Sequence, residues 1–140
     1  MSTRVIDASV VVKLYFEEEH SEAAEGLVAE AEGLMAPDFI WAETANVIWK
    51  RQRRGDITAD AAIDIARQVL ALPITVHPSA ELVPDALDLA VRYKRTVYDS
   101  LYLALALRTK SVLVTGDLRL VNALAGGPLE KFVAWIGKGR

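Results

Sequence analysis

The chain has 140 residues, no cysteine, and 16 basic against 19 acidic side chains, for a net charge of −3. This length predicts one domain with its own core, and a hydrophobic fraction of 52% excludes a disordered polypeptide. Without cysteine there are no disulfides or thiolate metal sites, and the longest apolar run, Leu101–Leu107, is too short to cross a membrane. No signal-peptide pattern is present, so we expect the protein in the cytoplasm.

The first predicted strand covers Arg4–Asp7. The next residues are ambiguous, because the β-branched run Val10–Val12 favours a strand, whereas Ser9 could cap a helix that continues to Phe16. The preferred interpretation is a strand over Arg4–Asp7 followed by a helix that runs through Phe16.

The rest of the chain alternates between apolar strands and helical stretches. Further strands are predicted at 34–36, 74–76, 111–114 and 132–136, and further helices at 20–31, 37–54, 58–72, 79–93, 97–108 and 118–125. The helix 97–108 is apolar nearly all round, which predicts that it is buried.

This alternation predicts the α/β class, as a three-layer α/β/α sandwich with a mainly parallel central sheet. No linker composition divides the chain. We therefore expect a single domain over 1–136 and a flexible C-terminal tail over 137–140.

Charge is segregated along the chain. The segment Glu17–Glu32 holds seven acids and no Lys or Arg, so the remainder has 16 basic and 12 acidic residues. Two basic clusters stand out, Lys50, Arg51, Arg53 and Arg54 in one and Arg92, Lys94 and Arg95 in the other. The total charge argues against a nucleic-acid binder, but the clusters could hold the phosphates of a polyanion. The alternative is that they are solvated helix ends favoured by the helix dipole.

Four acids occupy positions that suggest chemistry. Asp7 and Asp117 each follow a predicted strand, Asp99 begins the buried helix, and Glu43 shares an apolar stripe of the helix 37–54. Singly, the aspartates are typical helix caps or turn residues, and Glu43 could reach solvent from the edge of its stripe. Jointly, the topology of a parallel sheet places all four at the carboxyl edge, where sites of α/β proteins gather.

Four carboxylates at one edge repel one another and require a cation. The two histidines, His20 and His77, are far apart in the sequence, so the predicted ligands are all oxygen atoms. Such ligands favour Mg²⁺, with Mn²⁺ as a substitute, over Zn²⁺. A site of this kind binds phosphate oxygens and activates water, which predicts hydrolysis of a phosphodiester.

Two other function classes stay open. An Asp-based phosphotransfer domain is disfavoured, because the residue two positions after Asp7 is Ser9 rather than a second aspartate, and the late strand ends in Thr115–Asp117 without a lysine. A non-catalytic protein- or nucleic-acid-binding module would use the four acids only as caps and turns.

Four motifs then resemble those of the PIN-domain ribonucleases, in the same order and across nearly the whole chain. They are Val5-Ile6-Asp7-Ala8-Ser9, Pro37 with Glu43 and Asn46, Tyr98-Asp99-Ser100-x-Tyr102-Leu103-Ala104, and Thr115-Gly116-Asp117. The most similar form of the family is the VapC-type toxin of bacterial and archaeal toxin–antitoxin pairs.

The resemblance implies a three-layer fold and an endoribonuclease that depends on Mg²⁺ or Mn²⁺. It implies that the metal-site acids are Asp7, Glu43, Asp99 and Asp117, and that the hydroxyls that orient them belong to Ser9 and Thr115. It also implies an RNA substrate, a homodimer, a cognate antitoxin that covers the site, and contact with promoter DNA only through the antitoxin complex.

Overall fold

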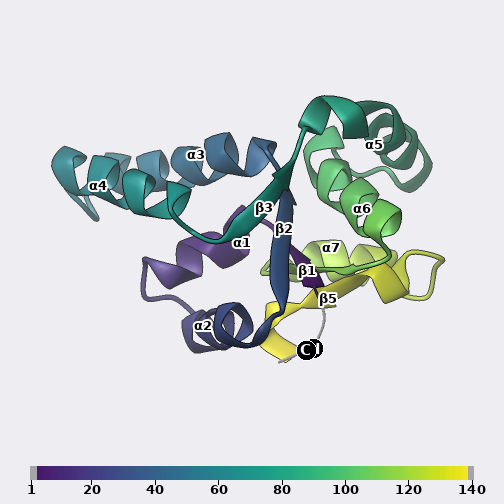
Figure 1. The fold of residues 1–140 in the computed structure, drawn as a ribbon, viewed down its shortest axis with the longest axis horizontal. Helices are drawn as coiled ribbons and strands as arrows, with labels where there is room; N and C mark the ends of the chain where they lie inside the picture. Colours follow the sequence, from purple (N-terminus) through teal and green to yellow (C-terminus); the bar gives the residue numbers. More distant parts are fainter. Residues whose placement is uncertain (1–2, 139–140) are drawn as a thin grey trace.

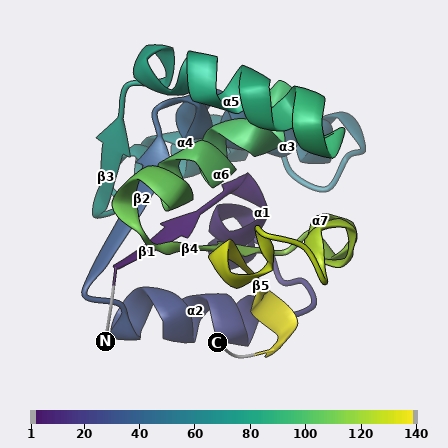
Figure 2. The ribbon, with the colours of Figure 1, turned by 90° about the vertical axis from the view of Figure 1, so that its right-hand side faces the viewer.

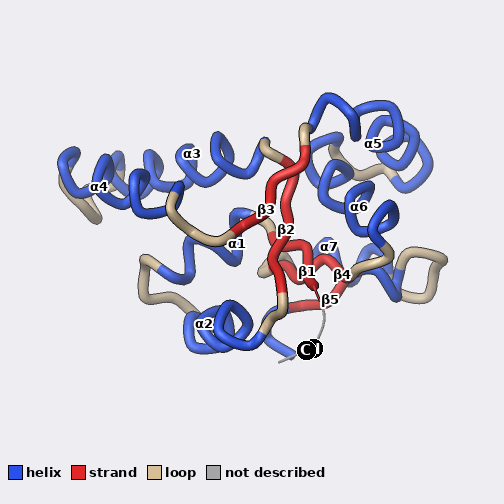
Figure 3. Tube along the Cα trace, in the orientation of Figure 1, coloured by secondary structure: helices blue, strands red, loops and turns tan. Residues whose placement is uncertain are grey.

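A five-stranded sheet lies at the centre of the computed structural model, which describes residues 3–138. Its strands are β1 (Thr3–Ile6), β2 (Gly33–Pro37), β3 (Ile74–His77), β4 (Val112–Thr115) and β5 (Val133–Trp135). They follow the order β3-β2-β1-β4-β5, and every neighbouring pair is parallel. Figure 3 shows the strands as one layer between helices. The parallel sheet and the α/β class predicted from the sequence are confirmed.

The strand order reverses direction between β1 and β4. From β1 the chain builds β2 and β3 on one side, and it then returns to place β4 and β5 on the other side. Ile6 of β1 is paired with Val114 of β4, so the residues that follow these two strands lie next to each other. In open α/β sheets the carboxyl ends of strands at such a reversal leave a crevice for a ligand.

Helices cover both faces of the sheet, as Figures 1 and 2 show. One side carries α5 and α6, and the other carries α1 to α4. Their bounds are α1 (Ala8–Val11), α2 (Ser21–Glu30), α3 (Phe39–Arg53), α4 (Ala59–Leu70), α5 (Ser79–Tyr93), α6 (Val97–Thr109) and α7 (Leu118–Leu124), with short 3₁₀ turns at Val12–Leu14, Glu130–Phe132 and Ile136–Lys138.

Helix α6 is the centre of the core, as its apolar sequence predicted. It packs against β1, β2 and β4 and carries α5 on its outer side, so every residue from Ser100 to Ala106 is buried. Truncating such a leucine, for example Leu105, to alanine typically costs about 2–5 kcal/mol. At its start the Thr96 hydroxyl accepts the Asp99 N–H at 3.0 Å, so the first turn of α6 is held firmly.

Two local boundaries differ from the sequence prediction. The segment after β1 is helical, as preferred, but α1 begins at Ala8, so Ser9 lies inside the helix and does not cap it. Pro37 ends β2 instead of beginning α3. The bonding to β3 continues one residue further, since the Asp38 N–H lies 2.8 Å from the His77 carbonyl oxygen.

The C-terminal end continues past the predicted domain boundary at 136. Gly137 belongs to the final 3₁₀ turn, and residues 139–140 of the expected tail lie outside the described residues. Among residues 3–138 no helix combines the length and the apolar character that a membrane span requires.

Candidate acidic site at the carboxyl edge of the sheet

The structure brings the four predicted acids to one edge of the sheet. Asp7 follows β1 and precedes α1, Asp117 caps α7 after β4, Asp99 lies in the first turn of α6, and Glu43 lies in α3. Their proximity is visible in their electrostatic coupling. The charge of Asp99 raises the pKa of Asp7, both charges raise the pKa of Glu43, and the charge of Asp117 raises the pKa of Asp99.

Two hydroxyl groups hold the carboxylate of Asp7. Thr115 Oγ1 donates to Asp7 Oδ2 at 2.6 Å, and Ser9 Oγ donates to Asp7 Oδ1. Each hydroxyl also accepts a backbone N–H, from Asp117 to Thr115 at 3.0 Å and from Gly116 to Ser9 at 2.7 Å. Because those N–H groups can only donate, each hydroxyl proton is left to point at Asp7. Both hydroxyls therefore donate to the same carboxylate, one to each of its oxygens.

Gly116 allows the β4 loop to approach α1 closely. A Cβ atom at this position would lie 3.0 Å from Ser9 Oγ and 3.1 Å from Lys13 Cε. Any larger residue would therefore push Ser9 away from the backbone N–H that orients its hydroxyl. Close packing against Ser9 and Lys13 thus explains why a glycine stands between Thr115 and Asp117.

Glu43 is held by a residue to which the sequence alone assigns no role. The Tyr102 hydroxyl donates to Glu43 Oε1 at 2.6 Å, and the Ala8 N–H supplies a further hydrogen bond. Burial, followed by the nearby Glu43 charge, raises the pKa of Tyr102, so it stays a donor. The spacing in the sequence could have indicated that Tyr102 lies near the acids, because it follows Asp99 by three residues and so shares its side of α6.

Burial is the main cause of the raised pKa of three of these acids. The pKa of Asp7 is raised by burial against the opposing hydrogen bonds from Ser9 and Thr115. The pKa values of Glu43 and Asp99 are also raised by burial first and by neighbouring carboxylates second. A bound cation would reverse both effects, since it would compensate the lost hydration and screen the like charges.

The donor chemistry of this edge fits a hard divalent cation. Its ligand atoms are carboxylate oxygens, which Mg²⁺ and Mn²⁺ prefer. Across residues 3–138, no three His, Asp or Glu side chains are close enough to form a ready-made metal-binding group. The four acids are therefore coupled neighbours rather than a closed ligand set.

One basic residue of the predicted clusters acts directly on this edge. The charge of Arg95 lowers the pKa of Asp99 against the effect of burial, and the Arg95 side chain is partly buried. Lys50 and Arg53, by contrast, line a surface pocket near the far end of α3. At 1.5 Å per helical residue they lie about 10 Å or more along the axis from Glu43.

Other basic residues of the clusters are engaged in ion pairs. Arg51 contacts the carboxylate of Glu18, and its guanidinium lies 4.6 Å from the centroid of the Phe16 ring. Lys13 binds the other carboxylate oxygen of Glu18 at 3.2 Å. This network ties the end of α3 to the loop before α2. Two more cluster members form the pairs Arg54–Asp56 and Arg92–Asp88.

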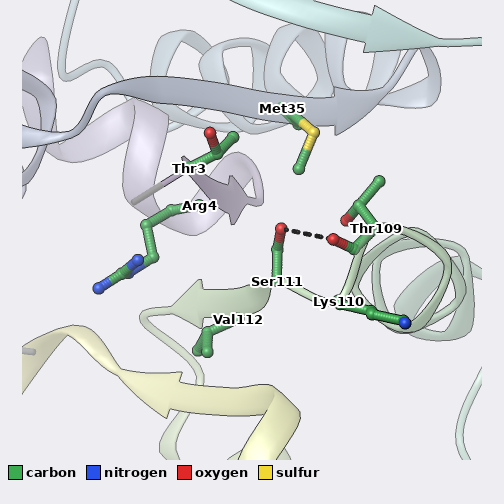
Figure 4. A pocket seen from close by; sticks show the side chains of 7 residues that line it. All are labelled: Thr3, Arg4, Met35, Thr109, Lys110, Ser111 and Val112. Atoms are coloured by element: carbon green, nitrogen blue, oxygen red, sulfur yellow. Dashed lines mark hydrogen bonds between the residues drawn. The ribbon is translucent and has the colours of Figure 1, made fainter. Parts of the chain in front are cut away.

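A second pocket lies at the opposite edge of the sheet, where β1 and β4 begin (Figure 4). It is lined by Thr3, Arg4, Met35, Thr109, Lys110, Ser111 and Val112. This lining contains no carboxylate. The predicted acids and this pocket are therefore separate features at the two ends of the strands.

The chain matches a known protein family over most of its length. The family model described as the PIN domain matches residues 4–124. The chain is 39% identical over 120 residues to Ribonuclease VapC3 of Pyrobaculum aerophilum, and the alignment covers 84% of this chain and 92% of that protein.

Solved structures share the fold at lower identity. A Pyrobaculum aerophilum protein has a TM-score of 0.70 at 23% identity, and the match covers 98% of this chain and 85% of that protein's chain. VapC20 of Mycobacterium tuberculosis, a sarcin–ricin loop cleaving toxin, has a TM-score of 0.63 at 20% identity over 81% of this chain and 87% of its own. A toxin–antitoxin complex from Klebsiella pneumoniae has a TM-score of 0.64 at 17% identity, and the match covers 94% of this chain and 95% of the chain in that complex.

Replacing Asp99 by asparagine should stabilise the protein when divalent cations are chelated. Folding raises the pKa of Asp99, so the ionised carboxylate destabilises the native state at pH values above that pKa. This loss of stability disappears as the pH falls below the ordinary pKa of 3.8, where the carboxyl is protonated in the unfolded chain too. We expect Asp99→Asn to raise Tm by about 2–5 °C at pH 7–8 and to lose this advantage near pH 3.

Thermal unfolding in chelator across this pH range measures the effect. The matched control is Asp88→Asn, which removes an exposed carboxylate that pairs with Arg92 on α5 and should not raise Tm. A lower Tm for Asp99→Asn at neutral pH would contradict the penalty that burial and like-charge repulsion place on the ionised carboxylate.

Proposed function

The chain belongs to the PIN-domain family, and from this membership and its acidic site we propose that it is a Mg²⁺- or Mn²⁺-dependent endoribonuclease. The observation that carries the proposal is the convergence of Asp7, Glu43, Asp99 and Asp117 where the sheet order reverses. The 39% identity to a protein named as a ribonuclease supports RNA as the substrate. The reaction adds water across a phosphodiester bond and leaves one phosphomonoester end and one hydroxyl end.

The four acids would hold the divalent cation. When bound, the cation stabilises the charge that develops on the phosphodiester and activates water. Ser9 and Thr115 orient Asp7 through their hydroxyl protons, and Tyr102 orients Glu43. Such supporting hydrogen bonds typically change metal affinity or activity by 10- to 100-fold when they are lost.

The RNA backbone must be held against a negatively charged edge. Arg95 is placed to contact a phosphate next to the cut site, because its charge already acts on Asp99. Within the clusters named from the sequence, Lys50, Arg53 and Arg54 line the pocket at the far end of α3 and would contact more distant phosphates. Arg51 is held by Glu18, so we assign it a structural role before an RNA-binding one.

We also propose that the protein is the toxin of a toxin–antitoxin pair. The similarity to a VapC ribonuclease supports this, and the fold shared with a toxin–antitoxin complex agrees with it. A cognate antitoxin, a homodimer, and promoter DNA bound only through the antitoxin complex belong to the same proposal.

RNA cleavage should require both the cation and the acids. Purified protein should cut total RNA at discrete sites with Mg²⁺ or Mn²⁺ and should not do so with chelator. Asp7→Asn and Asp99→Asn should lower the rate by about 10²-fold or more, because each removes a carboxylate that would hold the cation and so weakens the stabilisation of charge at the reacting phosphate.

Asp88→Asn serves as the control for this assay, since Asp88 is exposed and pairs with Arg92 on α5. Full activity of both site variants would overturn the metal-site assignment. Cleavage that persists in chelator would overturn the dependence on a cation.

Binding of the cation should be visible in stability without any RNA. A ligand that binds only the folded state at 100 times its Kd adds about 2.7 kcal/mol. Mn²⁺ should therefore raise the Tm of the wild-type protein by several degrees and that of Asp99→Asn far less. An equal rise in both proteins, or in neither, would favour the non-catalytic module, in which the acids are only caps and turns.

Removing the Tyr102 hydroxyl should change the pH dependence of cleavage. In Tyr102→Phe, Glu43 loses a hydrogen bond that favours its ionised form, so its pKa rises further. The acid limb of the kcat/KM profile should move to higher pH, with activity recovering on the alkaline side. A uniform loss at every pH would indicate damage to packing only, and Tyr93→Phe, at the end of α5, controls for loss of a tyrosine hydroxyl.

A further inference from the structure

Two aromatic rings stack at the rim of the acidic site. The rings of Phe39 and Tyr98 have centroids 5.0 Å apart and an interplanar angle of 13°. Phe39 is partly buried and packs against the core, whereas the Tyr98 side chain is 60% exposed. With one ring face against Phe39 and most of its surface exposed, Tyr98 presents its other face to solvent.

Both rings are placed by the same helices that carry site acids. Tyr98 directly precedes Asp99 in the first turn of α6, and Phe39 precedes Glu43 by one helical turn in α3. Residues four apart in a helix lie on the same side. The stacked pair therefore adjoins the carboxylates, and we call Phe39 and Tyr98 the aromatic platform.

The backbone beneath the platform is held by hydrogen bonds. The Ser79 hydroxyl accepts the Phe39 N–H at 3.0 Å, and the Ser79 N–H donates to Asp38 Oδ1 at 3.0 Å. These bonds fix the start of α3 against the start of α5. Hydrogen bonds from the Ser79 hydroxyl first, and from the Ser79 backbone N–H second, lower the pKa of Asp38. A ring on such a support loses little freedom when it binds a flat ligand, which favours affinity.

The chemistry of this edge favours a neutral contact with the substrate. The carboxylates repel a polyanion, and a stacking interaction does not depend on charge of either sign. Unpaired bases of RNA stack on exposed tyrosine and phenylalanine rings, whereas paired bases within a helix have no free face. A ring beside the catalytic acids would thus select RNA that is single-stranded at the cut site.

We propose that Tyr98, backed by Phe39, is a stacking subsite for an unpaired nucleobase next to the scissile phosphate. This inference rests on the proposed ribonuclease function and names the form of its substrate. Tyr98 acts through its ring face, so the hydroxyl is dispensable. Stacking of this kind tolerates any base, since every base has a π face.

The test uses the full chain and a short single-stranded RNA that carries a cut site mapped in total RNA. Tyr98→Ala should raise KM by about 5- to 100-fold, the usual value of one stacked base, with a smaller change in kcat. Tyr98→Phe should behave as wild type, because the ring remains. The control Val91→Ala trims an exposed side chain on α5 and should change nothing.

A second arm removes the base instead of the ring. Abasic residues placed singly around the cut site should weaken wild-type cleavage at one position by a similar factor. The same abasic RNA should cost Tyr98→Ala nothing further, because its partner is already absent. The Mn²⁺-induced rise in Tm should be equal in wild type and Tyr98→Ala, which shows that the acidic site is intact.

The outcomes separate this inference from the proposed function. An unchanged KM for Tyr98→Ala, or an abasic penalty that is the same in wild type and variant at every position, overturns the stacking subsite alone. If the wild type cuts no RNA, anisotropy with a fluorescent single-stranded oligonucleotide of mixed sequence replaces KM by Kd. A wild type that neither cuts nor binds RNA overturns both.

Discussion

Carboxylates gathered at one edge of a parallel sheet repel one another, and much of the polar bonding near that edge holds them in place. Asp7 accepts hydrogen bonds from the hydroxyls of Ser9 and Thr115, and Glu43 accepts one from Tyr102. Burial and mutual repulsion raise the pKa of both acids, while these bonds oppose the rise. The acids are therefore held in place by the protein itself, and under the proposed function a bound cation would relieve their repulsion.

The support for this edge begins in the core. Helix α6 is enclosed by the sheet on one side and α5 on the other, and it carries both Asp99 and the ring of Tyr98 into the site. The rim is chemically mixed. Arg95 supplies a positive charge beside Asp99, and the platform of Phe39 and Tyr98 supplies a neutral surface. Under the proposed function, these two features would hold a polyanion locally although the net charge of the chain is −3.

Much of this could be predicted from the sequence because it depends on local pattern. Alternating strands and helices imply a parallel sheet, and acids that directly follow strands, such as Asp7 and Asp117, must then lie at the carboxyl edge. The apolar surface of 97–108 likewise implies a buried helix. Boundaries were less certain, as Pro37 shows, because proline is compatible with both a strand end and a helix start.

Only the tertiary structure decided which groups meet. The strand order β3-β2-β1-β4-β5 brings Thr115 beside Asp7, and Tyr102 of α6 meets Glu43 of α3 at the edge of the sheet although the two helices lie on its opposite faces. Arg51 is charged in any context, yet its pairing with Glu18 depends on how the loop before α2 packs on α3. These contacts join residues far apart in the chain, and no periodicity encodes them. By itself the sequence determined which acids lie together at the carboxyl edge, whereas packing decided their partners, because a side chain's neighbours are set by how helices and strands fit together in space.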